Sequence, residues 1–154
     1  MTRTLRVIAF AMGNGIALLT AIAIFFYWRS NAAAPTPQSL KLINSLTVFS
    51  AAASFAAIVV SEFVWKKILA GASAANVNAT TQTAFIVRAA LREGAALAGC
   101  VTLLLAAQDG VLRAYPAYWV DLVPAALFWS FLCLHWPSLE NLRGELAEIL
   151  SPAP

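Results

Sequence analysis

Charged side chains are scarce in this sequence. Of its 154 residues only 11% are Asp, Glu, Lys or Arg, whereas a soluble domain usually carries about 25%. Hydrophobic residues make up 61% of the chain. This composition excludes an ordinary water-soluble domain and indicates that lipid surrounds much of the protein.

Cysteine and histidine are scarce too, which removes most metal and redox chemistry. Cys100 and Cys133 show neither CxxC nor Cys/His spacing, so we expect two separate, reduced thiols inside apolar segments. The single histidine, His135, is interpreted as a packing or membrane-interface residue, because a metal or haem site needs several ligands. The sequence therefore predicts neither a cofactor nor a metal site.

The sequence also lacks the short motifs of common enzyme sites. It contains no Gly-rich phosphate loop, no GxSxG and no HExxH. Its ten Lys and Arg residues are spread over loops and helix ends, without the clustered basic face that nucleic-acid binding requires. We therefore expect neither an enzyme nor a nucleic-acid-binding protein.

Long apolar segments are what the sequence does have. A bilayer core of roughly 30 Å needs about 20 apolar residues per helix, and four such segments cover residues 7–28, 42–65, 84–107 and 117–136. The first could be a secretory signal, but a signal core has only about 7 to 15 residues, so we interpret it as an uncleaved span. The prediction is an all-α fold, an integral membrane four-helix bundle, in one transmembrane domain over residues 1–154.

A final segment, residues 138–150, repeats apolar residues with the period of an amphipathic helix. They are Leu139, Leu142, Leu146 and Ile149. We predict a short amphipathic helix here. It would lie either on the membrane or a partner, or on the protein's own loops.

Lysine and arginine are distributed unevenly between the ends of the apolar segments. If the N-terminus is cytoplasmic, seven basic residues lie on the inner side and three on the outer side. The inner set is Arg3, Arg6, Lys66, Lys67, Arg88, Arg92 and Arg143; the outer set is Arg29, Lys41 and Arg113. The positive-inside rule then predicts that both termini are cytoplasmic in a cell inner membrane.

Five polar residues interrupt the apolar segments on the inner side. They are Asn14, Glu62, Arg88, Arg92 and Glu93. At about 1.5 Å per residue, Arg92 and Glu93 lie roughly 12 Å from the inner end of their segment, and Asn14 reaches a similar depth. Because a charge at the centre of a membrane helix costs about 2.5–3.5 kcal/mol, such groups usually find partners, and we expect a network.

The spacing of these residues leaves two interpretations open. Arg88 and Arg92 share a helix face and repel each other unless an acid lies opposite; Glu62 is the nearest candidate, although it could pair with Lys66 instead. In one interpretation Glu93 carries ions or protons under the influence of the arginines. In the other, the acids compensate the arginines so that the helix can insert, and the position of both arginines near the inner end favours this one.

Small residues recur every four positions on two segments, where helices can approach closely. The predicted packing positions are Gly13 and Ala17 on the first segment, and Ala90, Gly94 and Ala98 on the third. Such stripes serve either the packing of one bundle or the contact with another subunit.

The run from Glu93 to Gly99, EGAALAG, resembles the carboxylate helix of proteolipid c subunits of rotary ATPases. The partner helix of those subunits is rich in glycine, whereas residues 51–53 here are alanine. The third segment, a fourth apolar segment and the acidic tail after Trp136 and Pro137 together resemble a loose group of small bacterial four-helix membrane proteins. That resemblance implies a fold and no activity.

The sequence thus favours a structural or accessory subunit of a membrane complex. Its expected partners are membrane lipid and either further copies of the chain or other membrane subunits. The alternative function is an ion or proton conducting module that uses an intramembrane carboxylate, Glu93, with Arg88, Arg92, Glu62 and Asn14.

Overall fold

The computed structural model describes residues 2–30, 34–73 and 76–137, and the predicted amphipathic tail lies outside them. The described residues contain helices and connecting turns and no strand. Three long helices come first: α1 (Thr2–Arg29), α2 (Pro37–Ala70) and α3 (Val77–Gln108). The remaining elements are α4 (Val111–Ala114), the 3₁₀ helix η1 (Pro116–Leu122) and α5 (Val123–Leu134).

The helix ends follow local sequence signals. At the start of α2 the side chain of Thr36 accepts a hydrogen bond of 3.1 Å from the amide of Ser39, and Pro37 occupies the first turn, where its missing N–H is not needed. After α3, Gly110 adopts φ 71°, a left-handed conformation that glycine accepts without strain. The chain thereby reverses direction between α3 and α4.

The fourth apolar segment is a composite of two helix types. Pro116 opens η1, and Pro124 lies in the first turn of α5, where a proline costs little because the first amides of a helix lack intrahelical acceptors. The last helix ends at Leu134, before Trp136. The predicted segment 117–136 is thus helical over most of its length, but only Val123–Leu134 are α-helical.

Four helical segments of the described chain are long and apolar enough to cross a membrane: Arg3–Arg29, Pro37–Ala70, Val77–Gln108 and Pro116–Leu134. They extend beyond the predicted spans at several ends: α2 begins at Pro37 and α3 at Val77, whereas the predicted spans begin at residues 42 and 84. Large apolar side chains face outward; Phe10, Phe25, Phe49, Phe55 and Phe63 are 54–72% exposed. The length, composition and outward apolar surface indicate a multi-pass membrane protein.

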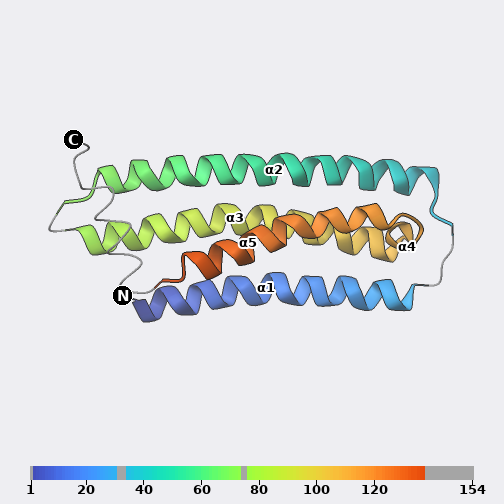
Figure 1. Ribbon diagram of the computed structural model, residues 1–154, viewed down its shortest axis with the longest axis horizontal. Helices are drawn as coiled ribbons and strands as arrows, with labels where there is room; N and C mark the ends of the chain where they lie inside the picture. Colours follow the sequence, from blue (N-terminus) through green and yellow to red (C-terminus); the bar gives the residue numbers. More distant parts are fainter. Residues whose placement is uncertain (1, 31–33, 74–75, 138–154) are drawn as a thin grey trace.

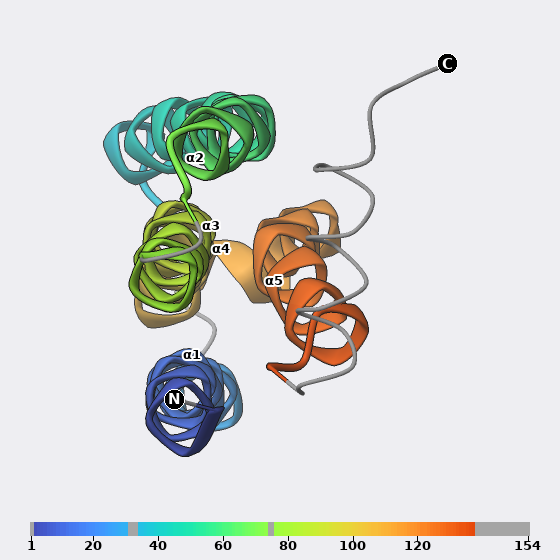
Figure 2. The same ribbon diagram turned by 90° about the vertical axis from the view of Figure 1, so that its left-hand side faces the viewer.

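The helices are arranged around α3. Figure 2 shows α1 and α2 on opposite sides of α3, with α5 against a third side. The sequence predicted four helices but did not indicate that one of them would lie at the centre. The central position of α3 is explained by its small buried side chains, which are Ala84, Ala89, Ala95, Ala96, Gly99, Ala106 and Ala107. Because these small residues occupy several faces of α3, the helices α1, α2 and α5 can all pack closely against it.

One end of the molecule gathers the start of α1, the end of α2, the start of α3 and the end of α5 (Figure 1). We call this the N-terminal end. A buried cluster around Phe85 and Phe128 fills this half, and a second cluster around Leu103 and Leu112 fills the other half. The charged residues predicted to form a network lie in the first half.

Candidate functional site

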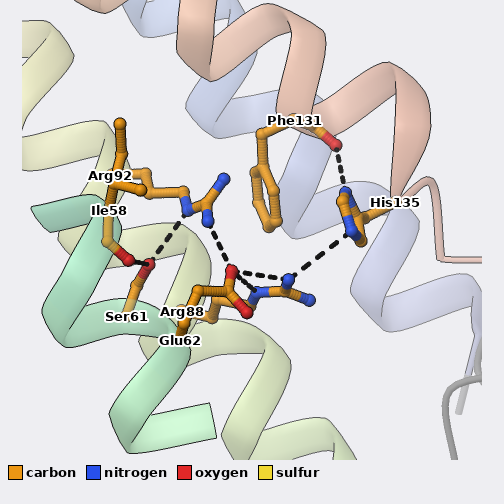
Figure 3. Close-up of polar contacts among 7 residues, drawn as sticks. All are labelled: Ile58, Ser61, Glu62, Arg88, Arg92, Phe131 and His135. Carbon is orange, nitrogen blue, oxygen red and sulfur yellow. Dashed lines mark hydrogen bonds and ion pairs between the residues drawn. The ribbon is translucent and has the colours of Figure 1, made fainter. Parts of the chain in front are cut away.

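Glu62 of α2 lies between two arginines of α3. Its Oε1 atom accepts hydrogen bonds from Nε and Nη2 of Arg88, at 2.9 and 2.6 Å, and from Nη2 of Arg92 (Figure 3). The arginines are four residues apart, so a helix turn presents both to the same face. One carboxylate therefore compensates two cations that would otherwise repel each other.

Ser61 gives Arg92 a second acceptor. Arg92 donates from Nε to the Ser61 hydroxyl at 3.0 Å, and that hydroxyl donates to the carbonyl oxygen of Ile58 at 3.0 Å (Figure 3). Ser61 is fully buried. Adjacent residues of α2 thus hold Arg92 at two of its nitrogen atoms.

Aromatic rings cover the guanidinium groups. The central carbon of Arg88 lies 5.0 Å from the ring centre of Trp65 and 5.2 Å from that of Phe131, and that of Arg92 lies 4.3 Å from Phe131. His135 stacks on Phe131, and its Nε2 lies 3.5 Å from Nη2 of Arg88. A cation over an aromatic face is stabilised most where water is absent. The contacts tie α2, α3 and α5 together, and we call Glu62, Arg88, Arg92, Ser61, Trp65, Phe131 and His135 the arginine cluster.

Two of the five predicted polar residues lie apart from this cluster. Glu93 makes no hydrogen bond or ion pair with any described residue, because it points about 100° away from Arg92 around the helix axis. Asn14 is exposed on α1, which lies on the opposite side of α3 from α2. The structure therefore brings together Glu62, Arg88 and Arg92, and it leaves Asn14 and Glu93 outside their contacts.

A second polar site lies in the other half of the molecule. Asp121 of η1 is 1% exposed; its two carboxylate oxygens accept hydrogen bonds from Thr47 at 2.9 Å and Ser50 at 3.3 Å. Sequence reasoning missed Asp121. The available signal was an acid in an apolar segment together with two hydroxyl residues three apart, which share a face of α2.

A groove between α2 and α5 extends between the two sites. One cavity of about 320 Å³ is lined by Thr47, Ser50 and Asp121. A neighbouring cavity of about 90 Å³ is lined by Arg92, and the two share Ser54, Ile58, Pro124 and Leu127. The groove is polar at its two ends, and the residues that both cavities share between them are apolar except for Ser54.

The predicted packing positions have different surroundings. A Cβ atom at Gly13 would lie 2.9 Å from the Trp129 ring, so α1 and α5 meet there. A Cβ atom at Gly94 would meet nothing within 4 Å, and Ala90 is exposed. Ala17 is exposed and Ala98 half-buried. The α3 stripe therefore lies largely on an open face of the molecule.

Both cysteines are free in the structure. Cys100 is buried on α3, with its sulfur 3.5 Å from the hydroxyl oxygen of Thr20, and Cys133 is exposed on α5. Among the described residues no group of three or more His, Cys, Asp or Glu side chains is placed to hold a metal ion.

Comparison with protein-family models, curated proteins and solved structures found no match.

Proposed function

We propose that this chain is a structural or accessory component of a membrane complex in a bacterial inner membrane, with both termini in the cytoplasm. The observation that carries the proposal is the internal bonding of the arginine cluster. Glu62 accepts from both arginines, and aromatic rings cover them. Such a cluster cross-links helices, and it makes Arg88 and Arg92 compatible with an apolar surrounding.

The orientation is supported by the distribution of charge. Arg3, Arg6, Lys66 and Lys67 lie near the N-terminal end, where the described chain also begins and ends (Figure 1). A bacterial cytoplasmic face retains such basic residues. The opposite end carries Arg29, Lys41 and Arg113.

The role within a complex is supported by the open face of α3. Ala90 and Gly94 present little side chain there, and a neighbouring groove of about 290 Å³ is lined by Ala53, Ala56 and Ala98. Small residues allow another membrane helix to approach closely. Either a second copy or another subunit would fit this chemistry.

The proposal is tested by native extraction. Tagged protein carrying a photo-crosslinking residue at Ala90 should give covalent adducts in intact membranes. On a denaturing gel these adducts should migrate above the band of the single chain, which has a mass of 16.4 kDa without the tag. The same label at buried Ala96 is the matched control, because that side chain is fully covered. Monomeric migration without adducts at Ala90 would overturn the proposal.

One observation favours a second candidate, an ion or proton conducting module. Asp121 is a buried carboxylate in an apolar segment, held by two hydroxyl groups beside the cavity of about 320 Å³. Intramembrane carboxylates of this kind occur in proton relays and ion pathways. Glu93, which the sequence favoured for this role, lies on a different face from Glu62 and its arginines.

This candidate is tested with purified protein in liposomes that contain a pH-sensitive dye. It predicts proton flux for the wild type, loss of flux in Asp121→Asn, and flux close to wild type in Glu93→Gln. Absence of flux in wild-type protein whose folding is verified by circular dichroism would dismiss this candidate and leave the structural role.

A further inference from the structure

Asn14 is the exception among the Asn, Ser and Thr residues of the four apolar segments. Those segments contain ten Asn, Ser and Thr side chains, and nine have a hydrogen bond within the described chain: Thr20, Asn44, Ser45, Thr47, Ser50, Ser54, Ser61, Thr102 and Ser130. Asn14 has none with any described residue, and it is exposed. Its amide therefore needs a partner from outside the described chain.

The depth of Asn14 in the membrane raises the free-energy cost of leaving its amide without a hydrogen-bond partner. It lies seven residues after Val7, or roughly 10 Å along the helix from the start of the apolar segment. At that depth there is little water to satisfy an amide, and an unpaired polar group in hydrocarbon is strongly unfavourable. A neighbouring protein helix that offers both a donor and an acceptor would remove this cost.

The residues around Asn14 form a regular seam on α1. Val7, Asn14, Ala21 and Trp28 are spaced seven apart, with Phe10, Ala17 and Ile24 following three residues after the first three; all seven are exposed. This is the a/d spacing with which one helix packs along another, and a single Asn at an a position fixes the register of such a pair. We call these seven residues the Asn14 seam.

The seam lies away from the contact between α1 and α3. The face of α1 that packs inward carries Leu5, Ala9, Ile16 and Ala23, all at 0% exposure. Figure 2 shows α1 at the edge of the molecule, with α3 on one side. A shallow groove of about 430 Å³ between α1 and α5, lined by Ala17, Ala21 and Trp129, continues the seam and leaves room for a neighbouring helix.

We propose that the Asn14 seam is a self-association surface, on which α1 of one copy pairs in parallel with α1 of a second copy through mutual Asn14 hydrogen bonds. This inference rests on the proposed membrane insertion and names the partner in the complex. All copies insert in the same orientation, so two α1 helices that meet about a two-fold axis run parallel, and each residue of the seam meets its own counterpart. A carboxamide is self-complementary, since its NH₂ group donates and its oxygen accepts.

The choice of α1 over α2 follows from the same hydrogen-bond pattern. The exposed face of α2 is apolar, with Phe49, Phe55 and Phe63, and lipid tails satisfy such side chains. Asn14 on α1, in contrast, carries an amide whose hydrogen-bonding groups lipid tails leave unmet. Ala17 and Ala21 beside it are small enough for the two backbones to approach.

The experiment uses the full-length chain in lipid nanodiscs and in native membranes. In a Cys133→Ser background, Val7→Cys and Ala21→Cys should form disulfide-linked dimers on mild oxidation, whereas Phe63→Cys on the exposed face of α2 is the matched control and should not. Dimer association, measured by energy transfer between labelled copies, should fall about 3- to 10-fold in Asn14→Leu and recover substantially in Asn14→Gln.

Because Asn14 has no bond within the described chain, Asn14→Leu should leave the monomer folded, which circular dichroism verifies. Equal cross-linking at Val7 and Phe63, or unchanged association in Asn14→Leu, would overturn self-association by this surface. If Val7→Cys instead captures a different protein, self-association fails and the accessory role stands. If the chain is monomeric and captures nothing, both proposals fail.

Discussion

Gly99 of α3 lies directly against the backbone of Asp121. A Cβ atom at Gly99 would be 2.6 Å from the Asp121 carbonyl oxygen and 3.1 Å from Cγ of Pro124. Both obstacles belong to the region where η1 passes into α5, and a backbone oxygen and a proline ring yield little. The absence of a side chain at Gly99 therefore sets how closely the fourth apolar segment approaches α3.

Gly99→Ala should consequently destabilise the fold. The added methyl group forces η1 away from α3 and disturbs the Asp121 contacts with Thr47 and Ser50, which we expect to cost about 1–3 kcal/mol, as for overpacking in a protein core. Unfolding in mild detergent, followed by circular dichroism, measures the change. Gly94→Ala is the matched control on the same helix, since nothing lies within 4 Å of its Cβ position; equal losses in both variants would contradict the prediction.

The two thiols should remain separate in the folded protein. Cys100 is buried on α3 beside Thr20, whereas Cys133 is exposed on α5. Protein denatured without reductant should therefore bind two molecules of a maleimide–polyethylene glycol reagent, giving two steps in gel mobility. Cys100→Ser and Cys133→Ser should each give one step, and an unshifted wild-type band would reveal a disulfide.

The presence and approximate positions of the long helices were predictable from the sequence, because a bilayer demands apolar segments of a certain length. Their neighbours were harder to predict. Segments such as 42–65 are apolar on nearly every face, so periodicity cannot indicate which face meets α3. The central place of α3 depends on how Gly99 and several alanines allow close approach, and this is a property of three-dimensional packing.

Part of the candidate site was predictable from the spacing of its residues along the helices. Helical spacing placed Arg88 and Arg92 on one face and pointed to Glu62 across the interface, since four residues make about one turn. It could not place Glu93 or Asn14, because no sequence pattern fixes how a helix is rotated about its axis. Asp121 was missed because it lies near the end of an apolar segment, where an acid would ordinarily be solvated.

Cysteine labelling can test the proposed orientation. In a Cys133→Ser background, Ser73→Cys lies between α2 and α3 at the N-terminal end, and Asp109→Cys lies at the opposite end; both positions are exposed. A membrane-impermeant thiol reagent should modify Asp109→Cys in intact cells whose outer membrane is permeable, and Ser73→Cys only after the inner membrane is opened. The reverse pattern would place both termini outside the cytoplasm.

The two acids near the arginines, Glu62 and Glu93, should contribute differently to the stability of the fold. Glu62→Gln leaves Arg88 and Arg92 without their shared carboxylate, so stability should fall by about 1–3 kcal/mol; the Glu62 side chain is 37% exposed, which places the cost between those of surface and buried ion pairs. Glu93→Gln should change stability by less than about 0.5 kcal/mol, because Glu93 has no bond to a described residue. Unfolding in mild detergent measures both variants.

A double-mutant cycle then separates pairing from general loss of charge. Arg92→Gln combined with Glu62→Gln should show a coupling energy of about 0.5–3 kcal/mol, as for residues in direct contact, whereas Arg92→Gln combined with Glu93→Gln should be additive within about 0.5 kcal/mol. The two cycles share one arginine and replace one acid each, so the net charge changes identically. Coupling of Arg92 to Glu93 that equals or exceeds its coupling to Glu62 would contradict the pairing of Arg92 with Glu62 described above.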